Sequence, residues 1–234
     1  MKSIQPVVHR VLFQSGLIVL TGLVLFTAGC AGSRDKNEAT TQDSKTNYYS
    51  LAVSIVPAST GTVEMSPSGN SFIYGTRITL NPTASAGYEF CRWGISLSAD
   101  TQINSGGVDS PLKIDMNSNK VVTAFFGISP AVAKSMLSSD AAIKLIDVRP
   151  KANYDQEHLP GAISIPFEYI STRASEIGSK DSRVIVSSDC YCPDDDEGAL
   201  AAQILIQQGF VNTVELHGGL AGWVEADYST VKGK

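Results

Sequence analysis

The periodicity of the apolar residues changes at Gly127, and this change constrains the fold more than any other feature of the chain. Before it, apolar and polar residues alternate in short runs, which predicts half-buried strands. Prolines and glycines separate these runs, and no helical stripe interrupts them. We therefore expect a small, all-β or β-rich module over residues 48–127. Its clearest strand patterns lie at 51–55, 61–65, 76–80 and 121–126.

After Gly127 the pattern alternates between helix and strand. Ser129 and Pro130 form a helix start, with a capping side chain followed by a first-turn proline. Buried strands are predicted at 144–148, 184–186 and 211–216, and a helix at 199–208 ends at Gly209. Such alternation builds a parallel sheet covered by helices. We expect an α/β domain over residues 128–234, with a parallel sheet and helices on both faces.

The N-terminus has the pattern of an export signal. Lys2 and Arg10 precede an apolar run over residues 11–28, which is typical of a signal peptide, although an uncleaved membrane helix has the same appearance. The run ends in TAGC, which resembles the lipobox of bacterial lipoproteins, with Thr27 in place of the usual leucine. The resemblance implies that residues 1–29 are removed and that Cys30 carries a lipid.

Residues 30–47 then predict a flexible linker, because they lack large apolar side chains. The lipid would anchor the protein to a membrane of the bacterial cell envelope. Aspartate does not follow Cys30, so the retention signal of enteric inner membranes is missing and we expect the periplasmic face of the outer membrane or the cell surface.

The β-rich segment resembles the divergent B-repeat module of bacterial surface proteins. The resemblance rests on a Gly-Thr-Val start at 61–63, a Tyr-Gly-Thr turn at 74–76, the segment GYEFCRW and a last strand ending in Phe125 and Phe126. It implies a spacer or an adhesion surface. We expect Trp93 and its aromatic neighbours to form a core and not a sugar-binding face, and Cys91 to be a small buried residue.

The C-terminal segment resembles a rhodanese domain. The residues that carry the resemblance are LIDVRPKANYDQEHLPGAISIPF, a strand that ends at a cysteine, a helix ending in QQGF, and VELHGGLAGW, in that order. In this family a loop cysteine between a central strand and the next helix carries a persulfide during sulfur transfer. Backbone amides at a helix start stabilise such a thiolate.

Two cysteines compete for that role in the predicted active-site loop. Cys190 directly follows the strand and lies eight residues before Gly198, which resembles a longer-loop group of rhodaneses; Cys192 has the six-residue separation of the common short loop. We choose Cys190 as the catalytic residue, with Cys192 as the alternate. The remaining loop residues are Asp189, Tyr191, Pro193, Asp194, Asp195, Asp196, Glu197 and Gly198.

The loop departs from the family in its charge. Glu197 stands where the common loop places an arginine, and a run of carboxylates precedes it, so an anionic donor such as thiosulfate is repelled. Asp147 and Arg149 match the Asp-x-Arg motif of the family and are expected to support the loop. His217, near the strand end that faces the loop, is a further supporting candidate, whereas the resemblance assigns His158 to folding.

These features predict a sulfurtransferase that takes sulfur from a sulfane-sulfur donor and passes it to a thiol acceptor. The alternatives are a non-catalytic rhodanese-like module that binds a protein partner, and a thiol redox protein that uses Cys190 and Cys192. No cofactor is expected and no metal site, because no second cysteine pair accompanies the first. The net charge of −5 and the absence of a basic block exclude nucleic acid as a partner.

Overall fold

The computed structural model describes residues 47–97, 104–189 and 197–233, all within the unit Ser44–Lys234. The predicted signal peptide and the lipidation residue Cys30 lie outside the described residues. Among the helices that are described, none is both long enough and apolar enough to cross a membrane.

Within the described residues the β module contains eight strands, and the four patterned runs correspond to β1, β2, β4 and β8. The bounds are β1 (Tyr48–Val56), β2 (Gly61–Ser66), β3 (Ser71–Ile73), β4 (Arg77–Ala84), β5 (Tyr88–Ser96), β6 (Asn104–Gly107), β7 (Leu112–Asp115) and β8 (Lys120–Ile128). Strands β2, β4 and β7 form a separate antiparallel sheet.

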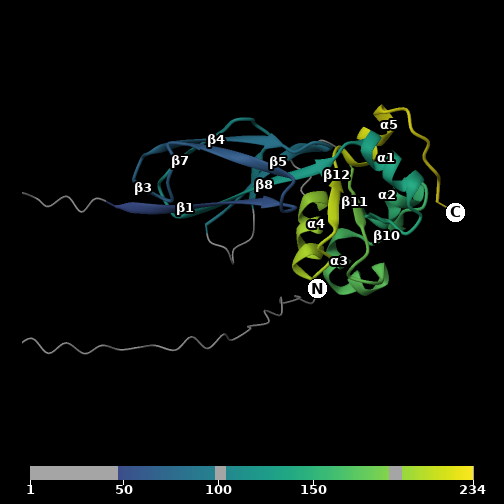
Figure 1. Ribbon diagram of the computed structural model, residues 1–234. Helices are drawn as coiled ribbons and strands as arrows, with labels where there is room; N and C mark the ends of the chain where they lie inside the picture. The colour runs from purple at the N-terminus through teal and green to yellow at the C-terminus, as the bar shows by residue number, and fades with distance from the viewer. Residues whose placement is uncertain (1–46, 98–103, 190–196, 234) are drawn as a thin grey trace, which may run out of the picture. The chain divides into compact units, whose positions relative to one another are not determined.

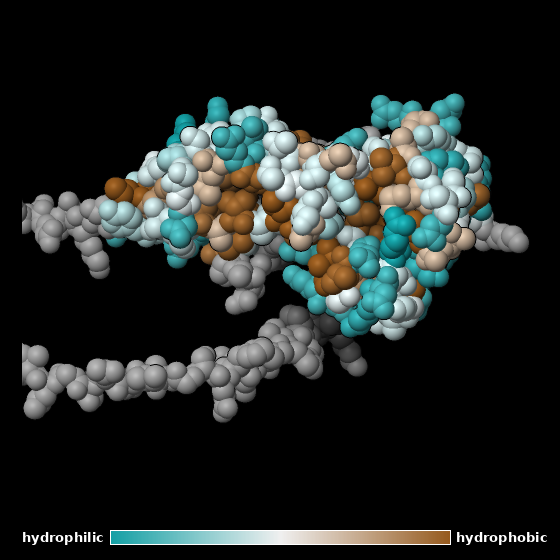
Figure 2. Space-filling model, viewed as in Figure 1, coloured by the Kyte–Doolittle hydropathy of each residue, from teal (hydrophilic) through white to brown (hydrophobic). Residues whose placement is uncertain are grey.

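The aromatic residues of the β module pack inward as expected. Trp93 is fully buried and its ring contacts Phe90, with 5.0 Å between the ring centroids. Its indole N–H donates to the carbonyl of Asp109. Apolar side chains that do reach the surface form separate brown patches on the face drawn in Figure 2. The aromatic side chains of this segment therefore form a core, as the alternation predicted.

The C-terminal segment alternates helices and strands. Its elements are α1 (Pro130–Ser139), β9 (Lys144–Asp147), α2 (Lys151–Gln156), β10 (Ile163–Ser164), η1 (Phe167–Tyr169), α3 (Ile170–Arg173), η2 (Ala174–Ile177), β11 (Val184–Ser187), α4 (Glu197–Gln207), β12 (Thr213–Leu216) and α5 (Gly219–Glu225). The predicted cap is present, since the Ser129 hydroxyl accepts from the amide of Val132. The strands run parallel in the order β10-β9-β11-β12-β8.

Helices cover both faces of this parallel sheet (Figure 1). On one face, Ile170 of α3 and Leu205 of α4 pack on Ile146 and Val186 of the central strands. On the other face, Ala133 of α1 and Trp223 of α5 pack on neighbouring strand residues. The predicted α/β fold, with helices on both faces of a parallel sheet and a β-rich region before it, is confirmed.

Strand β8 belongs to both halves of the sequence. It pairs with β5 and β1 of the β module, and Gly127 and Ile128 also pair with β12. The nine-stranded sheet is therefore mixed and not purely parallel, because β5 runs antiparallel to β8. The predicted boundary between residues 127 and 128 falls inside β8. The side chain of Tyr88, a residue of β5, also packs against the core of the C-terminal segment, so packing contacts cross this boundary as well.

Candidate functional site

The predicted site residues gather where three parallel strands end. Strands β9, β11 and β12 run in the same direction, so Asp147, Ser187 and Leu216 lie at one edge of the sheet. Open α/β sheets bind their ligands outside this carboxyl edge. The cysteine loop, which we define as residues 190–196, connects β11 to α4 here. Its residues lie outside the described part of the chain: Cys190, Tyr191, Cys192, Pro193, Asp194, Asp195 and Asp196.

A buried ion network holds the entry to the cysteine loop. Asp147 is fully buried, and its carboxylate accepts from Nε and Nη2 of Arg149, the shortest contact being 2.7 Å. The same guanidinium donates through Nη1 to Asp189, at 3.3 Å, and through Nη2 to the carbonyl of Glu157, at 2.6 Å. Asp189 directly precedes Cys190, so Arg149 ties the end of β9 to the first residue before the loop.

The charge of Arg149 is secured by its partners. Burial on its own lowers the pKa of this guanidinium, but the hydrogen bonds and charges of Asp147 and Asp189 outweigh burial and raise the pKa. The group therefore remains a cation at any physiological pH. Buried charges persist only when they are paired in this way.

Helix α5 fixes the same segment through the backbone. The amides of Leu220 and Ala221 donate to the carbonyls of Ser188 and Asp189, each at 2.9 Å. Gly219 has a positive φ of 53°, and a Cβ there would lie 2.4 Å from the Ser188 carbonyl oxygen. Only glycine permits this approach. We call Ser188 and Asp189 the entry anchor of the loop.

The exit of the loop has a different environment. Glu197 and Gly198, predicted as loop residues, form the first turn of α4, because this helix begins two residues earlier than its apolar pattern indicates. A Cβ on Gly198 would lie 2.6 Å from Oε1 of Glu215 and 2.9 Å from the Ser188 hydroxyl. The carboxyl group of Glu215, a residue only 8% exposed, thus packs directly on the first turn of α4. We call Glu197 and Gly198 the exit anchor.

The two histidines that the sequence singled out have separate roles. His217 follows β12 and lies 3.6 Å from the carboxylate of Glu89 in the β module. Burial lowers the pKa of His217, and the charge of Glu89 opposes this only in part. His158 stacks on the ring of Tyr154 and pairs through its backbone with Val231, which agrees with the folding role implied by the family resemblance.

Sequence reasoning missed two residues at this edge, Glu215 and Cys91. Cys91 is half-buried rather than fully buried, and its neighbours are Glu89 of its own module and Glu215 of the C-terminal segment. Both residues lie inside segments that carry the family resemblances, GYEFCRW and VELHGGLAGW, but neither resemblance assigns them a role. The only sequence signal was the glycine at positions 127 and 198. The backbone of Gly127 approaches the side chain of Cys91, and the backbone of Gly198 approaches the side chain of Glu215.

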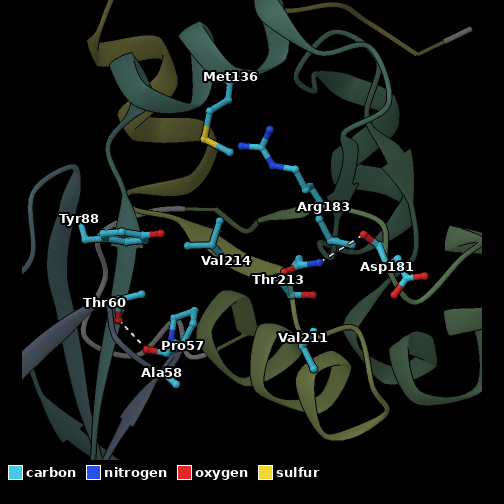
Figure 3. A pocket seen from close by; sticks show the side chains of 12 residues that line it. Pro57, Ala58, Thr60, Tyr88, Met136, Asp181, Arg183, Val211, Thr213 and Val214 are labelled. Atoms are coloured by element: carbon cyan, nitrogen blue, oxygen red, sulfur yellow. Dashed lines mark hydrogen bonds between the residues drawn. The ribbon is translucent and has the colours of Figure 1, made fainter.

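The described residues contain no group of three or more His, Cys, Asp or Glu side chains arranged to hold a metal ion. A cavity of about 510 Å³ lies elsewhere (Figure 3), lined by residues such as Tyr88, Arg183 and Val214. It opens at the amino ends of β11 and β12, where Val184 and Thr213 begin these strands. The cavity is therefore at the opposite edge of the sheet from the cysteine loop and contains none of the predicted site residues.

Two family models match the chain. Residues 129–226 match the family model of the rhodanese-like domain, and residues 51–130 match that of the divergent InlB B-repeat domain. A sulfurtransferase of Allochromatium vinosum is 32% identical over 87 residues, which cover 37% of this chain and 77% of that protein. The thiosulfate sulfurtransferase PspE of Escherichia coli is 38% identical over 81 residues, or 34% of this chain and 73% of PspE.

Two further similarities concern a sulfur carrier protein and a solved structure. YrkF of Bacillus subtilis, named as a sulfur carrier protein, is 28% identical over 96 residues, so that the match covers 41% of this chain and about half (49%) of YrkF. Among solved structures, the Alr3790 protein of Anabaena is 30% identical with a TM-score of 0.41, covering 45% of this chain and 80% of that one. The family matches and the two relatives covered over most of their length show that the chain belongs to the rhodanese-like family, joined to a divergent InlB B-repeat domain.

Proposed function

We propose that this chain is an exported, membrane-anchored sulfurtransferase that carries sulfane sulfur as a persulfide on Cys190, with Cys192 as the alternate. The Cys190 thiolate attacks the outer sulfur of a donor, the sulfur–sulfur bond of the donor breaks, and the remaining group leaves with the electron pair. An acceptor thiolate then attacks the outer sulfur of the persulfide, and Cys190 leaves as a thiolate. Relatives named sulfurtransferases or sulfur carriers support this reaction class.

The observation that carries the proposal is the link from Asp147 through Arg149 to Asp189. The two residues before Cys190 are held at three points: the Arg149 guanidinium and the Ala221 amide bind Asp189, and the Leu220 amide binds Ser188. A reactive cysteine needs such a rigid approach, because a loosely held nucleophile loses the benefit of orientation. The network places the start of the cysteine loop at the edge where ligands of α/β proteins bind.

The charge of the surroundings disfavours thiosulfate as donor. Asp189 and Glu197 flank the loop, Glu215 lies beneath its exit, and the loop sequence adds three aspartates. In water-like dielectric, a carboxylate about 8 Å from a dianion repels it by roughly 1 kcal/mol before screening by salt. Several such charges together disfavour a small dianion, whereas a donor with its charge far from the reactive sulfur avoids most of this repulsion.

Cyanolysis with two donors tests the proposal. The wild-type chain should release thiocyanate from glutathione persulfide more efficiently than from thiosulfate. Cys190→Ser should abolish both activities, while Cys192→Ser should retain most of them. In the triple variant with Asp194, Asp195 and Asp196 each replaced by Asn, thiosulfate turnover should rise by about tenfold or more, with a smaller change for glutathione persulfide.

Three other outcomes would change or overturn the proposal. Loss of activity only in Cys192→Ser transfers the nucleophile role to Cys192. If mass spectrometry finds no persulfide after polysulfide treatment, the chain is not a sulfurtransferase and a binding module is favoured. A binding module would also agree with Glu197 at the position where the common loop has an arginine. A stable disulfide between Cys190 and Cys192 in place of a persulfide would indicate a redox protein.

The membrane anchor is a separate part of the proposal and rests on the sequence around Cys30. Cells that express the wild-type chain should incorporate labelled fatty acid into it, and Cys30→Ser should abolish the label. Cys91→Ser is the matched control, because it removes a cysteine of the β module and should leave the label intact. Retention of Met1 without lipid would indicate an uncleaved membrane helix.

A further inference from the structure

Three strands bring acidic residues and a thiol together beside the exit anchor. Gly127 of β8 pairs with Glu215 of β12 on one side and with Glu89 of β5 on the other. Cys91 is the extra residue of a β-bulge in β5, since Phe90 pairs with Phe126 while Arg92 pairs with Phe125. Bulges often redirect a side chain beside a functional site. Here the bulge belongs to the β module and the strand it approaches belongs to the rhodanese-like fold.

Gly127 makes this approach possible because it has no side chain. A Cβ at this position would lie 2.8 Å from the Cys91 sulfur and 2.7 Å from the Glu215 carbonyl oxygen. Both distances are shorter than real Cβ contacts, so any other residue would push the thiol away from β12. The glycine that marked a domain junction in the sequence is therefore the contact point between the two segments.

Glu215 connects this contact to the start of α4. Its carboxyl group packs on Gly198, where the Cβ position lies 2.6 Å from Oε1 and 3.2 Å from the carboxyl carbon. Gly198 lies two residues after the cysteine loop. Glu215 thus lies beside the Cys91 thiol at Gly127 through its backbone, and its carboxyl group contacts the exit anchor.

The thiol of Cys91 acts as a hydrogen-bond donor on this path. Its single proton faces two acceptors, the carbonyl of Glu89 at 3.7 Å and the carboxylate of Glu215, which is the stronger acceptor because it is charged. Burial raises the pKa of Cys91 well above its usual value, and the charges of Glu215 and Glu89 raise it further. Cys91 therefore stays protonated, which suits a donor and not a second sulfur nucleophile.

Other charged groups share this side of the sheet. Alternate residues of β8 face the same way, so Arg92, the buried partner of Phe125, projects on the face that carries Glu89 and Glu215. His217 follows β12 and contacts Glu89, and Glu197 begins α4. The electrostatic effect of Glu215 on the loop is therefore the effect of its charge in the presence of these neighbouring charged groups.

We propose that Glu215 is a positioning residue of the sulfur-transfer site and that Cys91 of the β module holds its carboxylate in place. The inference rests on the proposed function, in which the cysteine loop carries the reactive thiol. A negative charge beneath the first turn of α4 opposes the positive end of that helix, and we expect it to raise the pKa of the reactive thiol in the loop before α4. The β module thereby adjusts the reactivity of the loop and does more than separate the domain from the membrane.

The test measures the pH dependence of thiol alkylation in the full chain, with peptide mass spectrometry reading Cys190 and Cys192 separately. Glu215→Gln keeps the shape of the side chain and removes its charge. The midpoint of the loop thiol should fall by about half a unit to one unit, since a nearby negative charge has been lost. Glu225→Gln, at the exposed end of α5, is the matched control and should leave the midpoint unchanged.

Substitutions of Cys91 test the second half of the proposal. Cys91→Ala removes the donor, so the buried Glu215 takes up a proton more easily and the loop midpoint should fall in the same direction by a smaller amount. Cys91→Ser replaces the donor with a hydroxyl and should restore the wild-type midpoint. Equal behaviour of the Ser and Ala variants, or a persulfide found on Cys91 itself, overturns this role.

The alkylation experiment uses no sulfur donor, so it separates this inference from the proposed function. If the wild type forms no persulfide but the midpoint shifts in Glu215→Gln, the sulfurtransferase proposal fails and the positioning role stands. If the midpoint stays unchanged in a Glu215→Gln protein with native circular dichroism, Glu215 only fills space. Should Glu215→Gln fail to fold, the comparison of Cys91→Ala with Cys91→Ser decides the same question.

Discussion

The entry and exit anchors of the cysteine loop lie at the same sheet edge but are held by different chemistry. The entry depends on a buried cation, Arg149, shared between Asp147 and Asp189 within the rhodanese-like segment. The exit depends on Glu215, packed between Gly198 and the Cys91 thiol of the β module. A charge network fixes one end by attraction, whereas close packing with a glycine fixes the other. Residues of the rhodanese-like segment alone therefore hold the entry anchor, whereas residues of both segments hold the exit anchor.

The largest expected effect comes from breaking the entry. Arg149→Met leaves Asp147 as a buried carboxylate without its cation, which should lower the free energy of unfolding by about 3–5 kcal/mol in urea denaturation. Arg183→Met is the control, because its ion pair with Asp140 is half-exposed and should contribute less than about 1 kcal/mol. A loss at Arg149 no larger than at Arg183 would mean that water or a rearranged side chain replaces the network.

An intermediate effect is expected at the exit. Gly198→Ala forces a Cβ against the Glu215 carboxyl group and should lower the free energy of unfolding by about 1–3 kcal/mol. In a Glu215→Ala background the same change should cost clearly less, because only the contact with the Ser188 hydroxyl remains and alanine favours a helix over glycine by up to about 1 kcal/mol. Equal effects in the two backgrounds, measured as a double-mutant cycle, would show that Glu215 does not constrain Gly198.

The smallest effect concerns His217, which joins the exit side to Glu89. Because burial lowers its pKa in the folded state, the unfolded chain binds the proton more readily. The folded state should therefore lose stability as the pH falls below about 6.5, and the loss should stay under about 1 kcal/mol. His217→Gln should flatten this part of the pH–stability curve, whereas an unchanged slope would assign the dependence to other groups.

The entry anchor could be predicted from the sequence and the exit anchor could not. Asp147 and Arg149 are two residues apart and follow a buried strand, so their pairing and their position at the sheet edge follow from local pattern. Cys91 and Glu215 are separated by more than a hundred residues and meet only because β5 and β12 flank the same glycine of β8. No periodicity encodes that meeting, since it depends on the register of two strand pairs.

The helices and strands can also be divided into those that the sequence predicted and those that it did not. Apolar alternation located β1, β2, β4 and β8, but β3 and β6 have only three and four residues and left no pattern. The start of α4 was placed late because Glu197 and Gly198 carry no apolar side chain, although a carboxylate in the first turn suits a helix start. The continuity of β8 across residue 127 was hidden because a glycine there resembles a linker.

The shared strand also sets an order of events during synthesis. Residues up to Ile128 precede β12 along the chain, so in synthesis and in the proposed export they emerge first, and the β module can complete β8 against β1 and β5 before the last partner of β8 is present. Open strand edges recruit other chains and promote aggregation. Only Gly127 and Ile128 pair with β12, and an edge of two residues is shorter than the strands that proteins commonly use. Until β12 is present, the β module therefore exposes only a short unpaired edge of β8, and a neighbouring chain has little backbone to which it could add a strand.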